Sequence, residues 1–174
     1  MRKAAALGLL LLMPVMARAQ DALTAAANAF YSASVAAGAS GGGVPNAATR
    51  VRFQPLLSAR LNKLLSDGAA AEARFKARNK DAPPLIEGDI FSSLFEGPTQ
   101  FKVGVCRGDA KIQRCAIALS RQDPGQKSAS WTDTLVLTNE AGWKVDDIAY
   151  DANFAFGNTG TLDEMLKMTV SEAP

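Results

Sequence analysis

Two groups of side chains in this 174-residue sequence could take part in chemistry. The first lies in the stretch GWKVDDIAYD, where Asp146 and Asp147 interrupt an apolar run that ends near Tyr150. Burial in an apolar pocket raises the pKa of a carboxyl group, and a raised pKa suits general acid or base catalysis. Asp147 and Tyr150 are therefore candidate catalytic residues. The alternative is that both aspartates bind backbone amides or pair with lysines and arginines.

The second group lies in the stretch EGDIFSS, which contains Glu87, Asp89, Ser92 and Ser93. These carboxylates and hydroxyls could line the mouth of a binding pocket, and Asp89 is a further candidate acid or base. Equally, Asp89 and the serines could stabilise an extended turn by hydrogen bonds to the backbone. We favour the structural interpretation for both groups, because structural ion pairs perturb carboxylates much as active sites do.

The composition excludes several kinds of site. The chain has no histidine, which rules out Ser-His-Asp and Cys-His nucleophilic sites and His-ligated zinc. Two cysteines cannot form a four-thiolate metal site, and the glycine-rich stretch GASGGGVP lacks the Lys-Ser/Thr ending of a phosphate loop. That stretch is predicted to be a flexible loop. We therefore expect no metal and no cofactor. Since basic residues and aromatics do not alternate in any run, we also expect no nucleic-acid partner.

The first 19 residues have the pattern of a secretory signal peptide. A basic start, an apolar core and the small-residue motif ARA predict cleavage near Ala19. The apolar core is shorter than the roughly 20 residues of a membrane span. Loss of Arg2, Lys3 and Arg18 would change the net charge from +2 to −1. We expect a periplasmic protein with two segments, a signal peptide at 1–19 and one domain at 20–174.

Helical periodicity comes first along the predicted domain. A helix is expected over 21–37 with Asp21 as its N-cap, and a second over 55–68, beginning at Pro55 and ending at Gly68. A third helical piece, 69–79, follows after a break. Arg60 and Lys63 of the second helix are expected to face water, whereas the large aromatics Trp131, Trp143, Phe91 and Phe95 are expected in the core.

Apolar residues alternate with polar ones after residue 100, which predicts antiparallel strands and a short C-terminal helix capped by Thr161. Asp146–Asp147 breaks the alternation of the last strand. Either a bulge lies there or the strand is covered on both faces. Without a bulge, Asp147 would point into the concave side with Trp143 and Val145, and Asp146 would point outward with Lys144.

Cys106 and Cys115 flank one predicted turn and are expected to form a disulfide in an oxidising compartment. A regular hairpin with the apolar pairs Phe101–Leu119, Val103–Ile117 and Val105–Cys115 would place Cys106 on the opposite face, out of reach of a disulfide. The bond therefore requires a bulge or register shift, which we expect near Arg107–Gly108. The alternative is two unpaired cysteines in a regular hairpin.

Helices followed by a strand meander are typical of an α+β layer fold. The segments FYSASVAAG, FQPLLSARLNKLL and GWKVDDIAY resemble the cystatin-like cone shared by ketosteroid isomerase and nuclear transport factor 2. The segments PPLIEGDIFSSLFEGPTQFKVG and GWKVDDIAYD resemble a family of exported bacterial proteins in that superfamily. The resemblance covers nearly all of the predicted domain. It implies N-terminal helices packed on a bent antiparallel sheet of about four strands, and by analogy a homodimer.

Three kinds of function are compatible with these features. The first is a non-catalytic exported domain that binds a protein partner or a small apolar ligand. The second is a cofactor-free isomerase, dehydratase or cyclase that uses Asp147 or Asp89 with Tyr150. The third is an inhibitor or immunity protein against an exported hydrolase. We favour the first, and a carboxyl pKa near neutrality in a closed, apolar cavity would favour the second.

Overall fold

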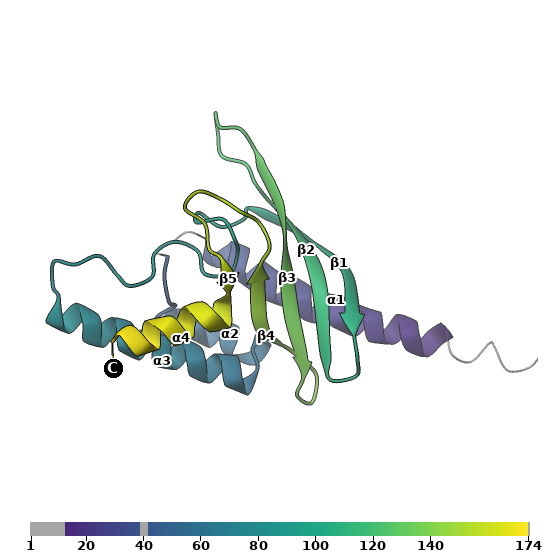
Figure 1. Ribbon diagram of the computed structural model, residues 1–174. Helices are drawn as coiled ribbons and strands as arrows, with labels where there is room; N and C mark the ends of the chain where they lie inside the picture. The colour runs from purple at the N-terminus through teal and green to yellow at the C-terminus, as the bar shows by residue number, and fades with distance from the viewer. Residues whose placement is uncertain (1–12, 39–41, 174) are drawn as a thin grey trace, which may run out of the picture.

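The computed structural model describes residues 13–38 and 42–173, with side chains from residue 20 onward. Helices come first, a five-stranded antiparallel sheet follows, and a helix ends the chain (Figure 1). The predicted α+β class is therefore confirmed. The elements are α1 (Met13–Ala37), α2 (Ala47–Phe53), the 3₁₀ turn η1 (Gln54–Leu56), α3 (Ala59–Arg78), β1 (Gln100–Gly108), β2 (Ile112–Arg121), β3 (Ala129–Asn139), β4 (Trp143–Tyr150), β5 (Gly160–Thr161) and α4 (Leu162–Glu172).

Helix α1 packs across one face of the sheet, in contact with β1 and β4 (Figure 1). Its buried positions recur at helical spacing and are Leu23, Ala27, Phe30, Tyr31 and Ser34. The helix begins at Met13, so the prediction that Asp21 is its N-cap is wrong. Good helix formers precede Asp21, and Pro14 suits a first turn. Residues 1–12 of the predicted signal peptide lie outside the described residues.

Helix α3 is one continuous element, not two pieces with a break at Gly68. It begins at Ala59 and not at the predicted Pro55, which lies in η1, and its N-cap is Ser58, whose hydroxyl accepts a hydrogen bond from Leu61 N at 2.9 Å. A Cβ at Gly68 would lie 3.2 Å from Leu166 Cδ2 of α4. Gly68 therefore lets α3 and α4 approach closely and does not end the helix. None of the helices in the described part of the chain has the length and hydropathy needed to cross a membrane.

The sheet is a meander in the order β1 to β5, with one more strand than expected, the two-residue β5. The predicted pairs Phe101–Leu119 and Val103–Ile117 are confirmed. So is the cap of α4, where Thr161 Oγ1 accepts from Glu164 N and the Glu164 carboxylate accepts from Thr161 N. The inward face of the sheet packs against α1 to form the apolar core.

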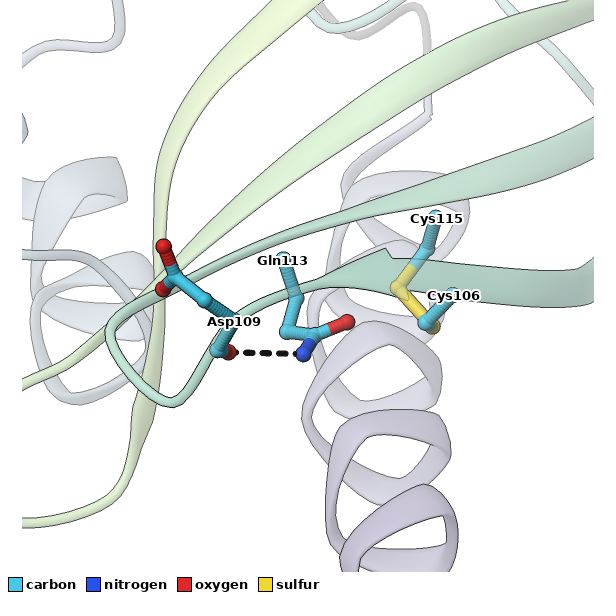
Figure 2. Close-up of a disulfide and its surroundings, with 4 residues drawn as sticks. All are labelled: Cys106, Asp109, Gln113 and Cys115. Carbon is cyan, nitrogen blue, oxygen red and sulfur yellow. Dashed lines mark hydrogen bonds between the residues drawn. A yellow bond between two sulfur atoms is a disulfide. The ribbon is translucent and has the colours of Figure 1, made fainter.

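The predicted disulfide is present between Cys106 and Cys115, which face each other across β1 and β2 (Figure 2). The bulge that permits it is not at Arg107–Gly108, where pairing is regular. It lies at Gly104–Val105, between the pairs Val103–Ile117 and Cys106–Cys115. A Cβ at Gly104 would lie 2.8 Å from Ala116 O, so glycine suits this close approach. Val105 is 62% exposed as a result.

A second bulge lies in β4 at Asp146, because Leu137 pairs with Val145 but Val136 pairs with Asp147. The extra residue resets the alternation, so that Val145, Ile148 and Tyr150 are all buried. The bulge alternative is therefore correct. Asp147 does not share the buried inner face of the strand with Val145, because the extra residue shifts its phase.

Candidate functional site

The loop between α3 and β1 carries the second predicted group, Glu87, Asp89, Ser92 and Ser93. The structure places these four residues in different surroundings. Ser92 and Ser93 are completely buried and bind backbone or carboxylate groups. Asp89 lies beside a cavity, whereas Glu87 is exposed at a separate surface hollow. The four residues do not form one pocket mouth.

Asp133 of β3 anchors this loop to the sheet. Its carboxylate is completely buried and accepts hydrogen bonds from Ser93 N (2.8 Å), Ser93 Oγ, Trp131 Nε1 (3.1 Å) and Asp151 N (3.2 Å). Asp133 was not among the predicted site residues. A signal was present, because Asp133 falls in the same alternating phase as the apolar residues Trp131 and Leu135.

The cavity has a volume of about 360 Å³ and opens between the C-terminal end of α1, the segment after it, α2 and the loop before β1. Its apolar wall includes Phe53, Ile90 and Phe91, which are all buried. The rings of Phe53 and Phe91 lie 4.9 Å apart and hold each other in place. Polar groups reach the cavity from Ser34 and Asp89, and Glu96 and Arg121 also line it. This combination of an apolar wall and few polar groups is typical of a ligand site.

The glycine-rich segment builds one side of the cavity. Gly43 N donates a hydrogen bond to Gly88 O at 2.5 Å, and a Cβ at Gly42 would lie 2.6 Å from Gly88 N. Glycine is therefore needed at position 42, because the two backbones touch. In its described part, this segment is packed against the loop before β1. Residues 39–41 lie outside the described residues.

Asp89 is the most unusual acidic group at the cavity. Its Oδ1 accepts a hydrogen bond from Phe91 N at 2.5 Å, whereas Oδ2 has no hydrogen-bond partner among the described residues. Burial raises the pKa of Asp89 from 3.8 to about 6, and the nearby Asp133 also raises it. The Phe91 N–H and Arg121 oppose that shift. A carboxyl group in this state can accept a hydrogen bond, pair with a cation or exchange a proton near neutral pH.

Two tyrosines lie close to this carboxylate but do not line the cavity. Tyr150, a predicted catalytic candidate, is buried and donates its hydroxyl hydrogen to Ile90 O at 2.7 Å. The Tyr31 hydroxyl is completely buried and has no hydrogen-bond partner in the described structure. Burial raises the pKa of both phenols well above 10, and the charge of Asp89 adds to both shifts. Both phenols therefore stay protonated near neutral pH.

The aspartates of β4 bind α3 and α4 instead of the cavity. Asp146 accepts from Ser58 Oγ at 2.6 Å and pairs with Arg60 at 3.0 Å. Asp147 accepts from Ile148 N at 2.8 Å and from Asp163 N at 2.9 Å, near the start of α4. Burial raises the pKa of Asp147, and these two N–H groups oppose the shift. Arg60 was expected to face water, and it does so while it also pairs with Asp146 and Asp163.

A shallower hollow of about 560 Å³ lies on the other side of Phe95. Phe154, Phe156 and Glu87 line it, and Phe156 is 89% exposed. Phe95 was predicted to be in the core but is 39% exposed, because it forms the wall between the hollow and the cavity. Lys63, which was expected to face water, does so and pairs with Asp67.

The fold and this site together define an α+β domain with a half-open, mainly apolar cavity and one buried acidic group. The described residues contain no cluster of three or more His, Cys, Asp or Glu side chains that could hold a metal ion. No family model, no curated protein and no solved structure matches the chain.

Proposed function

We propose that this protein is an exported, non-catalytic binding domain that holds a small, largely apolar ligand in the cavity beside Asp89. The observation that carries the proposal is the cavity itself, where aromatic side chains form the wall and one oxygen of the partly buried Asp89 carboxylate has no hydrogen-bond partner among the described residues. Drug-sized ligands bind in cavities of this size and chemistry. This binding function requires no catalytic residue.

Two further parts of the proposal concern origin and family. We propose that the chain is exported to the periplasm with cleavage near Ala19, and that it belongs to the nuclear transport factor 2-like superfamily. The disulfide supports export, because such bonds persist in oxidising compartments. The order of helices and bent antiparallel strands supports the superfamily (Figure 1). Mass spectrometry of the purified periplasmic protein tests the cleavage, and an intact Met1 would contradict it.

A blocked cavity tests the binding function. Thr49 and Val51 lie on the same short helix, but Thr49 lines the cavity whereas Val51 is 64% exposed. N-phenylnaphthylamine, whose fluorescence rises in apolar sites, should bind the unmodified protein and Val51→Trp. It should not bind Thr49→Trp, because the indole would fill the mouth of the cavity. Equal binding by the two variants, or no binding by any form, would exclude a ligand site here.

One observation favours a second function, cofactor-free proton transfer. Asp89 has both a free oxygen and a pKa of about 6, which suits a general base near neutral pH. This function predicts that the protein accelerates deuterium exchange at the α-carbon of a cyclic ketone such as cyclohexanone in heavy water. Asp89→Asn should abolish the acceleration. If exchange is equal with and without protein, proton abstraction from this class of substrate is excluded and the binding function is unaffected.

A further inference from the structure

The Asp89 carboxylate lies at a cavity whose described lining residues include no unpaired cation. Arg121 is the basic residue in the cavity lining, and its guanidinium is fully engaged. It donates to both carboxylate oxygens of Asp123, at 2.6 and 2.9 Å, and to the backbone oxygens of Glu96 and Gly97. Asp89 and Glu96 therefore contribute negative charge to the cavity that no free cation of the lining offsets.

The position of the Asp89 carboxylate is fixed before any ligand enters. Its Oδ1 is held by Phe91 N, and its backbone N donates to Phe95 O at 2.7 Å. Gly97, at φ 72°, lies against Oδ2 where no side chain would fit. A charged donor that enters would meet an acceptor that is already oriented and partly withdrawn from water, which favours a strong charge-assisted hydrogen bond.

The cavity lining also offers a hydroxyl and an apolar surface. Ser34 is 5% exposed and lines the cavity, and its hydroxyl has no hydrogen-bond partner among the described residues. Beside it, Phe53, Ile90 and Phe91 present hydrocarbon. A ligand with an apolar body and one donor head can therefore bury its body against the aromatic rings while its head reaches Asp89.

We infer that the ligand is a compact hydrophobic amine, whose ammonium group donates to Asp89 Oδ2 and whose apolar body packs on Phe53 and Phe91. The inference rests on the proposed binding function and names its ligand class. An amine matches the uncompensated negative charge, the free acceptor and the apolar wall together. A hydrophobic carboxylate matches only the wall, and it would be repelled by Asp89 and Glu96.

Calorimetric titration with matched compounds tests the inference. The probes share cyclohexyl, adamantyl or naphthylmethyl bodies, and each body carries an amine, an alcohol or a carboxylate. We expect the best-fitting amine to bind at least about tenfold more tightly than its alcohol at about pH 7.5, which corresponds to a charged in place of a neutral hydrogen bond. The carboxylate should show no binding. Asp89→Asn should remove the advantage of the amine but keep alcohol binding, and Glu87→Gln, an exposed control on the same loop, should change neither.

The pH dependence of the unmodified protein gives an independent readout. Amine affinity should fall as the pH drops through about 6, where Asp89 takes up a proton, while alcohol affinity stays constant. The groups that act on Asp89 there are Asp133, Arg121 and the Phe91 N–H, with Tyr31 and Tyr150 nearby. An alcohol that binds as well as its amine would overturn the inference and leave the binding function intact. If no compound binds, both fail.

Discussion

Two aspartates that contact the loop before β1 or lie in it, the buried Asp133 of β3 and the partly buried Asp89, have opposite hydrogen-bonding states. Asp133 accepts from the backbone and hydroxyl of Ser93, from Trp131 and from the backbone of Asp151. Among the described residues, Asp89 accepts only from the Phe91 backbone, which leaves its other oxygen without a partner beside the cavity. Both carboxylates raise the pKa of Tyr31 and of Tyr150, so the two aspartates lie close enough to act on the same side chains.

This difference separates a structural carboxylate from a candidate functional one. A buried polar group stabilises the fold when its partners satisfy it, and it weakens the fold when they do not. Asp133 accepts hydrogen bonds from Ser93 in the loop that carries Asp89. It therefore positions the site without contacting a ligand. Asp89 has the free acceptor that a ligand needs, and its raised pKa shows that the fold disfavours its charge. The predictions below test this division of roles.

The largest expected effect is at Asp133. Asp133→Ala would leave the Ser93, Trp131 and Asp151 donors buried without an acceptor. We expect the free energy of unfolding to fall by about 4 kcal/mol or more, because several buried groups lose their partner at once. Urea unfolding followed by tryptophan fluorescence measures it. A midpoint close to that of the unmodified protein would show that Asp133 does not anchor the loop. Asp133→Asn, which keeps one acceptor oxygen, should lose less.

Asp89→Asn should raise the free energy of unfolding at neutral pH, whereas Asp133→Ala should lower it. The pKa of this acid is higher in the folded protein, about 6, than its ordinary value of 3.8. Between these values the folded state binds a proton that the unfolded chain has released, so Asp89 makes stability fall as the pH rises. Above pH 6 the variant should therefore be more stable than the unmodified protein by on the order of 2–3 kcal/mol.

The pH profile of that difference is the sharper measurement. The gain should be full above pH 6 and should disappear below pH 4, where the neutral acid and the amide are alike. Unfolding curves of both proteins across this interval give the profile. A variant that is less stable at neutral pH would mean that Asp89 is a satisfied structural carboxylate like Asp133.

Tyr31 carries a buried polar group that, unlike Asp89, does not line the cavity. Its hydroxyl has no partner among the described residues, whereas its ring packs against Phe30 and Phe101. Tyr31→Phe keeps the ring and removes the unsatisfied hydroxyl, so we expect stability to rise by about 1–2 kcal/mol. Tyr150→Phe is the matched control. It removes a hydroxyl that bonds to Ile90 O and should lower stability by about 1 kcal/mol. Thermal unfolding distinguishes the two signs.

Alternation and helix-capping patterns were enough to predict most elements of the fold. The strands, the Phe101–Leu119 register and the Thr161 cap depend on neighbouring residues, which a sequence displays directly. Gly68 was misread because glycine ends many helices, and the sequence does not show that α4 packs against it. The bulge at Gly104 was misplaced for a similar reason, since its cause is the carbonyl of Ala116 on the next strand.

The candidate site was less predictable because it depends on long-range contacts. Asp89 was among the candidates by its place in EGDIFSS, but its free oxygen and its cavity come from α1, α2 and the glycine-rich segment. Asp146–Asp147 attracted attention because two charges interrupt an apolar strand. The bulge at Asp146 explains that pattern, and the carboxylates bind the starts of α3 and α4.

The smallest expected effect is at Asp147, and it tests whether the β4 aspartates belong with Asp133. Asp147 Oδ1 accepts from Ile148 N and from Asp163 N, which lies in the first turn of α4. Asp147→Ala removes this acceptor, which resembles the loss of a helix cap and should cost about 1 kcal/mol. Asp147→Asn keeps an acceptor oxygen at the same place, so its stability should stay within about 0.5 kcal/mol of the unmodified protein. Both variants should bind N-phenylnaphthylamine and the hydrophobic amines normally, because Asp147 does not line the cavity. If either variant loses ligand binding while its unfolding curve is unchanged, β4 contributes to the site, and the assignment of function to Asp89 in place of the β4 aspartates is wrong.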